Sequence, residues 1–390
     1  MTIRMFHLTI NYQLKNRQMK IFFTFFFALY FIAISNAQVY SNKEAGKKNE
    51  AIADSLKAAE YPYILPIWGA KVASKGFDLP YSAGLSLNYA WQQSDLVIDN
   101  LSVGFNNGPM YNIDEIVRFN SAVSTTSLLN FRPDFWILPF LNVYGLIMKG
   151  NSSTAINAGL WLPDTANVWR EVTSFSSKAD FSATGMGFGM TPTVGVAGGF
   201  MAFDLNVAWT DVDALDKPVF SFVFGPRFGK SFKFKKPERT LAVWAGGFRV
   251  HIASETNGSL MLSEVMPIDD IQSKVDDGMQ KVEDAQVNVD EWWNGLSSEE
   301  QKNPINAAKY ETANRVIGNT SELLTSIDGA LSNAETASVQ YSLTKRPKDM
   351  WNFIVGSQFQ INKHFMIRAE YGFLGSRQQL TTGLQYRFGL

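Results

Sequence analysis

The last residues of the chain alternate between apolar and polar side chains with a period of two. The apolar positions are Leu384, Tyr386, Phe388 and Leu390. The positions between them are Gln385, Arg387 and Gly389. Because successive side chains of a strand point to opposite faces, this pattern predicts a strand with one apolar and one polar face. Such a strand suits a wall between hydrocarbon and water.

The N-terminal region predicts export. Residues 21–34 form an apolar run between basic residues and the small-residue sequence Ser35-Asn36-Ala37. This arrangement describes a cleavable secretory signal, which we expect at residues 1–37. The run is short for a helix that spans a bilayer. Met19 suits the natural start of such a signal, so we hypothesise that residues 1–18 are a mis-assigned extension.

Composition narrows the class of protein further. The chain has 30 Phe, 10 Trp and 13 Tyr, a heavy aromatic load for a soluble protein of 390 residues. It has no cysteine, which excludes disulfides, thiolate metal sites and a lipidated N-terminal cysteine. The net charge of −1 predicts no nucleic-acid partner. After the signal, the sequence contains no run of about 20 apolar residues, so we expect no membrane-spanning helix there.

One region departs from this composition. Residues 255–349 contain 17 acidic and 8 basic residues, a net charge of −9, and no Phe. Such a change marks an inserted unit. We therefore divide the mature chain into a periplasmic N-terminal segment (38–61), a first barrel part (62–254), the insertion, and C-terminal barrel strands (350–390).

Most of the chain outside the insertion alternates as its end does. The pattern is clear in residues 85–91, 201–209 and 365–373. A soluble sandwich can alternate in this way, but the signal and the large apolar face favour a barrel. We predict an all-β, transmembrane, antiparallel β-barrel of about 14 strands, with 12 also acceptable. The predicted strands include 62–73, 82–91, 96–105, 168–177 and 181–197.

The signal, the alternating strands and the aromatic C-terminus resemble those of Gram-negative outer-membrane β-barrels. Residues 386–390 are similar to the signature by which such barrels are recognised for assembly. The resemblance implies a location in the cell outer membrane, with outer-membrane lipid and the barrel assembly machinery as partners. An even strand number implies periplasmic N- and C-termini. Counting back through the last three strands then places the insertion outside the cell.

Two heptad seams in the insertion predict an antiparallel α-helical hairpin with coiled-coil packing. The first seam runs from Ile268 to Trp292 and the second from Tyr310 to Tyr341. Three roles stay open for this hairpin: a solvated cap over the barrel mouth, an arm that binds a partner, and a plug in the lumen. Trp292 and Trp293 at its tip either contact a glycan, lipid or protein partner or pack the helix end.

The polar faces of the strands are expected to line the lumen. The predicted lumen residues are Asp204, Asn206, Arg227, Arg249, Gln358, Arg368, Glu370, Gln385 and Arg387. Opposed arginines and carboxylates in a barrel form stabilising ladders, and a selectivity filter is the alternative. Gly185, Gly187 and Gly189 share one face, which predicts either room for a solute or plug, or a strongly coiled strand. Residues 135–148 are apolar on both faces, which suits a buried internal segment or an apolar solute.

The sequence predicts no enzyme. His251 lies near Ser254 and Asn257, which invites comparison with outer-membrane phospholipases. Because His251 and Ser254 are three residues apart on a predicted strand, their side chains point to opposite faces. Asp269-Asp270 and Asp276-Asp277 lack the spacing of a calcium loop. We expect neither a metal ion nor a cofactor.

The leading prediction is a porin-like channel or transporter for a small solute, which the doubly apolar strand allows to be apolar. The alternative is an interaction protein whose barrel anchors the acidic helical arm, which then binds a surface partner. A lipid-modifying enzyme is the third hypothesis and has only His251 in its favour.

Overall fold

The structure is a computed structural model. It describes residue 54 and residues 60–390 apart from 164–168, 214, 216, 235, 237, 253–254, 266–267 and 334–335. The expected signal peptide lies outside the described residues.

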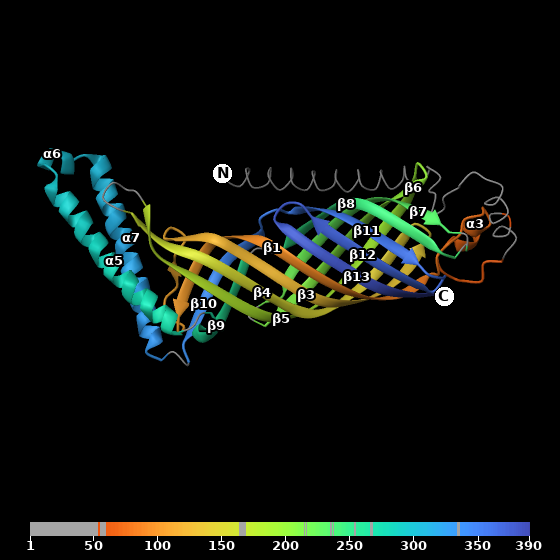
Figure 1. Ribbon diagram of the computed structural model, residues 1–390, viewed down its shortest axis with the longest axis horizontal. Helices are drawn as coiled ribbons and strands as arrows, with labels where there is room; N and C mark the ends of the chain where they lie inside the picture. The colour runs from red at the N-terminus through yellow and green to blue at the C-terminus, as the bar shows by residue number, and fades with distance from the viewer. Residues whose placement is uncertain are drawn as a thin grey trace, which may run out of the picture.

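Ten antiparallel strands form a closed barrel (Figure 1). In order around the barrel they are β1 (Ala83–Phe105), β3 (Val117–Leu138), β4 (Leu141–Pro163), β5 (Trp169–Val196), β6 (Gly199–Val212), β7 (Val219–Lys233), β8 (Thr240–Ile252), β11 (Trp351–Gln360), β12 (Phe365–Phe373) and β13 (Arg377–Phe388). The pairing of β13 with β1 closes the cylinder. The predicted antiparallel barrel is confirmed, and the predicted strand number is wrong.

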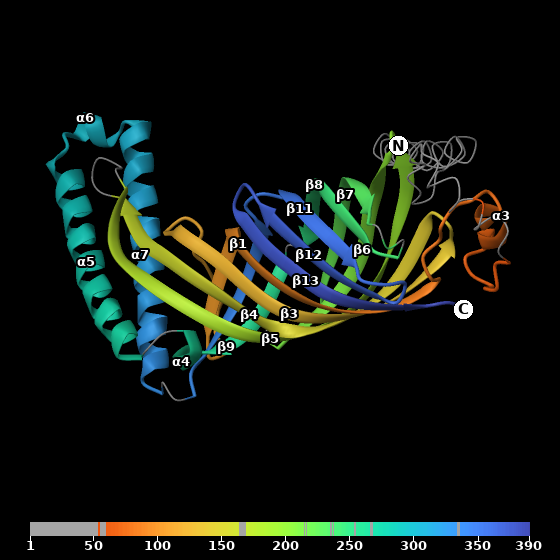
Figure 2. The same cartoon turned by 45° about the vertical axis from the view of Figure 1, so that its right-hand side comes forward.

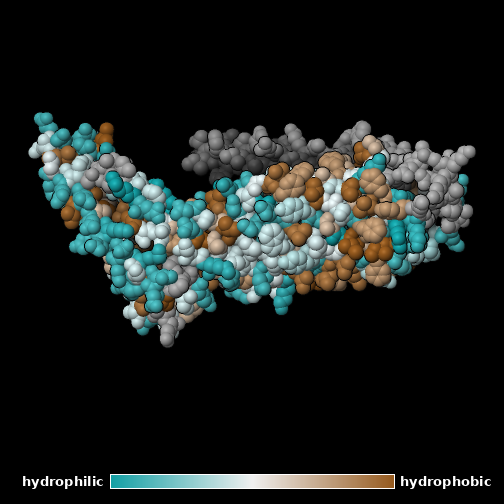
Figure 3. All heavy atoms as spheres, viewed as in Figure 1, coloured by the Kyte–Doolittle hydropathy of each residue, from teal (hydrophilic) through white to brown (hydrophobic). Residues whose placement is uncertain are grey.

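An apolar band surrounds the barrel on its outer face. The alternation of β1, β5 and β13 turns Leu87, Phe188 and Leu384 outward, where their side chains are 53%, 60% and 61% exposed. Figure 3 shows apolar residues gathered over the half of the barrel nearer the C-terminus, and hydrophilic residues over the other half. Bulky apolar side chains exposed around a closed cylinder form the lipid-facing band of a membrane barrel.

Four strands continue well beyond this band. β5 has 28 residues, whereas a tilted strand crosses a bilayer in about 9–11 residues. Along β5 the bulky residues change face, because Met186 and Phe188 point outward and Phe181 points inward. The same change occurs in β1. It explains why the sequence prediction divided each of these strands into two.

The extended strands form a second sheet beyond the band. Ser94 of β1 pairs with Arg377 of β13, but Leu96 pairs with Pro347 of β10 (Ser338–Pro347). β10 also pairs with β9 (Glu255–Met261), and the short β2 (Tyr111–Asn112) pairs with β1. We call this arrangement, ordered β5-β4-β3-β1-β10-β9, the outer sheet.

The inserted helices lie at this end of the molecule. α5 (Ile268–Gly295) and α7 (Pro304–Leu331) run antiparallel and are joined through the short α6 (Ser298–Gln301) (Figure 2). α4 (Leu262–Val265) follows β9. The second helix ends at Leu331, so its predicted extension to Tyr341 is wrong. The reason is that Val339, Tyr341 and Leu343 alternate as a strand, which becomes β10.

The helices pack on the lumen-facing side of the outer sheet. One apolar cluster joins residues of both, including Leu101, Val117, Leu160, Val172, Val275, Val282, Val316 and Leu324. The helical hairpin is therefore one layer of a domain whose other layer is the continued barrel wall. None of the helices in the described part of the chain is long and apolar enough to cross a membrane.

The opposite end of the barrel carries α3 (Gly69–Ala73) beside the C-terminus (Figures 1 and 2). The strand predicted at 62–73 is thus wrong. Ile64 N and Leu65 N both donate to Leu390 O, at 2.8 and 3.2 Å, and Ile67 N donates to Ile137 O at 2.9 Å. These bonds hold the segment before β1 across the barrel end.

Candidate lumen site

A network of charged side chains in the barrel is centred on Glu370 of β12. Its carboxylate accepts hydrogen bonds from Arg227 Nε at 2.8 Å, Arg227 Nη2 at 3.1 Å and Trp244 Nε1 at 2.8 Å. Arg368 Nη2 lies 3.4 Å from the same carboxylate. The side chains of Arg227 and Glu370 are only 8% and 6% exposed. Bidentate, charge-assisted contacts of this kind are among the stronger hydrogen bonds in proteins.

Asp204 of β6 is the second carboxylate of the network. It lies 3.4 Å from Arg227 Nη1 and accepts hydrogen bonds from the Tyr144 hydroxyl at 2.6 Å and Thr191 Oγ1 at 2.8 Å. Asn206 Nδ2 donates to the same tyrosine hydroxyl at 3.4 Å. We call these side chains, with Glu370, Trp244 and Arg368, the Glu370 network.

Glycines on intervening strands give these side chains their space. A Cβ added at Gly356 of β11 would lie 2.4 Å from the Trp244 ring. A Cβ at Gly189 of β5 would lie 2.5 Å from the Tyr144 phenol. The face that the glycine pattern leaves bare is therefore filled at Gly189 by a large side chain of the neighbouring strand.

A second polar group surrounds Asp134 of β3, nearer α3. Asp134 accepts hydrogen bonds from Arg387 Nη2 at 2.6 Å, Gln385 Nε2 at 2.6 Å and Asn142 Nδ2 at 2.7 Å. Arg387 Nη1 also donates to Tyr81 O at 2.7 Å. The C-terminal strand thus ties the segment before β1 to the barrel wall.

A cavity of about 630 Å³ lies between that segment and the Glu370 network. Tyr81, Trp136 and Phe200 contribute aromatic surface to its wall, and Arg132 and Arg368 contribute positive charge. At the segment's edge of the cavity, burial beside Tyr63 raises the pKa of Tyr61 to about 12.

Apolar side chains fill the barrel on the other side of the network. Leu146, Val250 and Ile354 point inward there and are 7%, 9% and 0% exposed. An eight-stranded barrel has an interior just wide enough for its own side chains. Ten strands leave modest additional space, and in this structure that space is on the α3 side of the network.

Most of the predicted lumen residues meet in this interior. They are Asp204, Asn206, Arg227, Arg368, Glu370 and Arg387. Arg249 does not join them, so its prediction as a lumen residue is wrong. It pairs with lipid-facing Phe224 and lies on the outer face, 6.0 Å from the centre of the Trp351 ring. Gly246 and Gly247 interrupt the apolar pattern of β8 shortly before it, so the sequence carries little sign of which face Arg249 takes.

Sequence reasoning missed Arg132, Asp134, Tyr144 and Trp244. The signal was present for the first two, which alternate with the apolar residues of β3. The turn Pro139-Phe140 joins β3 to β4, so residues 135–148 are a hairpin rather than one doubly apolar strand.

The predicted contact residues of the helical hairpin are partly buried against its own tip. The Trp293 ring stacks on Tyr310 with centres 4.5 Å apart, and Trp292 lies 6.1 Å from Trp293. The Tyr310 hydroxyl donates to Asp290 Oδ1 at 2.9 Å. This hydrogen bond raises the pKa of Tyr310. These contacts pack Trp293 against the helix end, and a partner contact of the two tryptophans stays a prediction.

Two lysines of α5 cover the exposed edge of β5. Lys281 Nζ donates to Val172 O at 2.5 Å, and Lys274 Nζ donates to Ser174 O. Unpaired strand edges are templates for association with other chains. These contacts therefore shield part of the edge where β5 rises past β6.

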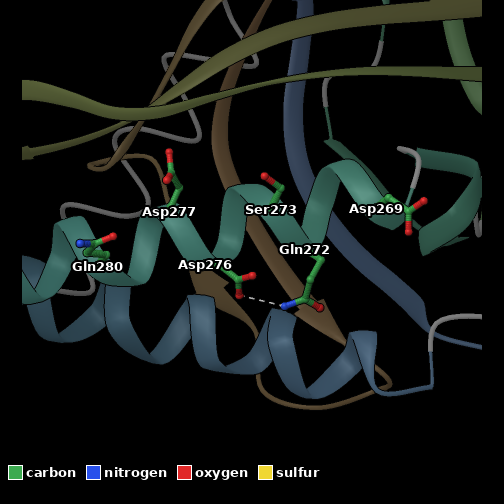
Figure 4. A pocket seen from close by; sticks show the side chains of 6 residues that line it. All are labelled: Asp269, Gln272, Ser273, Asp276, Asp277 and Gln280. Carbon is green, nitrogen blue, oxygen red and sulfur yellow. Dashed lines mark hydrogen bonds between the residues drawn. The ribbon is translucent and has the colours of Figure 1, made fainter.

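The remaining chemical candidates stay apart. His251 is exposed on the outer face opposite Phe222, and Ser254 lies outside the described residues. On α5, the carboxylates of Asp269, Asp276 and Asp277 point in different directions, and Asp276 accepts a hydrogen bond from Gln272 at 3.0 Å (Figure 4). Within the described ranges, no three His, Asp or Glu side chains could hold a metal ion.

The closed antiparallel cylinder, its apolar band and its polar interior define the chain as a β-barrel of the outer-membrane class. No protein-family model matches the chain, and no curated protein matches it.

Among solved structures, the chain is similar to the translocator domain of autotransporter NalP from Neisseria meningitidis, with 11% identity, 82% of this chain and 92% of that chain covered, and a TM-score of 0.30. It is also similar to a Pseudomonas aeruginosa FadL homologue, with 8% identity, 86% and 98% coverage, and a TM-score of 0.25. A third similar structure is the outer membrane channel COG4313 from Pseudomonas putida F1, with 10% identity, 79% and 96% coverage, and a TM-score of 0.25.

Proposed function

We propose that the chain is a gated outer-membrane transporter for a small solute, which binds in the lumen cavity. The observation that supports this proposal is the cavity of about 630 Å³, a volume typical of small-molecule sites. The Glu370 network and the apolar layer at Ile354 close the path beyond it. Passage then requires both the network and this apolar layer to rearrange. The helical hairpin lies on the extracellular side in this proposal, and both termini are periplasmic.

Planar bilayers test the proposal. The double variant Arg227→Ser/Glu370→Ser removes both charges of the central ion pair together, so neither of these two charges is left facing a neutral side chain. We expect brief, rare conductance steps from the unaltered chain and larger, more frequent steps from this variant. The matched control is Lys178→Ser/Asp180→Ser, which removes an exposed ion pair of 3.6 Å on β5. Silence from both the unaltered chain and the network variant, with each shown to be inserted and folded, would end the transporter proposal.

The second candidate is a membrane-anchored interaction protein. It is favoured by the outer domain, by which we mean the outer sheet together with the helical hairpin. This domain has its own apolar core and extends beyond the bilayer. For this candidate, substituting exposed Val287 of α5 by Ser would abolish binding of a co-purifying partner and leave conductance unchanged. A variant that retains every partner and alters conductance would argue against it.

A further inference from the structure

We propose that the lumen cavity binds an organic carboxylate, with Arg132 and Arg368 as the residues that recognise it. This inference rests on the proposed function, because it names the class of solute that binds in the cavity.

The first argument is charge. Near the Glu370 network the cavity is lined by three guanidinium groups, from Arg132, Arg227 and Arg368, and by one carboxylate, Asp204. Glu370 lies behind this wall, against Arg227 and Arg368. The charged residues of the rest of the lining are Glu60, Asp78, Glu238, Lys233, Lys363 and Arg387, which carry no net charge. Arg227 contacts both carboxylates, and Arg368 shares one of them. Among the described residues, Arg132 has no carboxylate oxygen within ion-pair distance. Excess charge is costly away from bulk water, so an anion in the cavity is favoured and a cation is not.

The second argument is geometry. The Arg132 guanidinium carbon lies 3.5 Å from the centre of the Tyr144 ring, and that of Arg368 lies 4.8 Å from the centre of the Trp244 ring. Stacking holds one face of each guanidinium, which fixes its orientation. The Arg368 side chain is 32% exposed, and both arginines line the cavity. A fixed guanidinium fork matches the planar shape of a carboxylate.

The third argument is the rest of the wall. Trp136 and Phe200 line the same cavity. They would contact the body of a ligand whose charged end meets the arginines. Inorganic anions would leave this surface unused, so the fitting ligand is a monocarboxylate with an aromatic or short aliphatic body.

Binding to the full chain in detergent micelles tests this assignment. The probes are benzoate, benzamide and benzylamine, which share a ring and differ in charge, and titration calorimetry measures their affinities. We expect benzoate to bind at least tenfold more tightly than either of the others. Arg132→Gln and Arg368→Gln should each weaken benzoate at least tenfold, and Arg132→Lys should weaken it less than Arg132→Gln. The matched control, Arg249→Gln on the outer face, should bind benzoate as the unaltered chain does.

Equal affinity for benzoate and benzamide, or unchanged benzoate binding in Arg132→Gln, would overturn the assignment. Heat-dependent mobility in electrophoresis establishes that each variant is a folded barrel. Should Arg132→Gln not fold, Arg132→Lys and Arg368→Gln decide the outcome. The assay needs no translocation, so a chain that binds benzoate but passes no solute keeps this site and loses the transporter proposal. A chain that conducts but does not bind benzoate keeps the transporter proposal and loses this site.

Discussion

Replacing Glu370 by Gln should destabilise the barrel by about 3 kcal/mol, because breaking a buried ion pair typically costs about 3–5 kcal/mol. Glutamine can still accept the Trp244 hydrogen bond, but the carboxylate charge that faces Arg227 is lost. The estimate lies at the low end of the range because Asp204 remains 3.4 Å from Arg227.

Urea unfolding in lipid vesicles, followed by tryptophan fluorescence, measures this difference. The matched control is Asp180→Asn, whose side chain is 70% exposed beside Lys178. An exposed pair is worth about 0–1 kcal/mol, so the control should change little. The double variant Arg227→Met/Glu370→Met should recover part of the loss, since Arg227 is then no longer buried opposite a neutral side chain. A free energy of unfolding for Glu370→Gln within about 0.5 kcal/mol of the unaltered value would refute the reasoning.

Three further outcomes are expected. Lys281→Met should uncover the edge of β5 and speed amide hydrogen exchange nearby, and an unchanged exchange pattern would contradict the edge contact. Gly189→Ala should destabilise the barrel by roughly 1–3 kcal/mol through overpacking, whereas Gly329→Ala, which has open space in α7, should stabilise it by up to about 1 kcal/mol; equal urea midpoints would be inconsistent with both. The raised pKa of Tyr310 means that its stabilising effect is complete below the unfolded pKa and is lost as pH rises through the folded one, so Asp290→Asn should lower that folded pKa in a nuclear magnetic resonance titration.

The membrane part of the fold could be read from the sequence because lipid imposes a simple rule. In β13 the bulky residues keep one parity from end to end, and in β12 only Met366 departs from it. The alternation seen in residues 365–373 and at the C-terminus is confirmed as these two strands. The same rule failed in β5 and β1, where the apolar face turns from lipid to the inner core of the outer domain. A strand that serves two environments in turn has no single alternation to detect.

The lumen network was partly predictable for a related reason. Arg227, Arg368 and Glu370 stand on strands with clear apolar partners, so their inward direction follows from the alternation. Their partners Tyr144 and Trp244 are aromatic, and an inward aromatic residue is indistinguishable in sequence from one that faces lipid. Which inward residues meet across the lumen depends on strand order and register, which no local pattern contains.

Four strands of the outer sheet, β1, β3, β4 and β5, run without interruption from the barrel wall to the layer that carries the helical hairpin. Because α5 and α7 pack directly on these four strands, a force applied to either helix would reach the barrel wall through that apolar core. Excising residues 255–349 would also strip Leu101, Val117 and Leu160 of their cover, so a truncated chain would report on damaged packing as much as on a missing arm. Residues 255–349 are one continuous segment of the sequence, but in the structure they share an apolar core with the extended barrel strands.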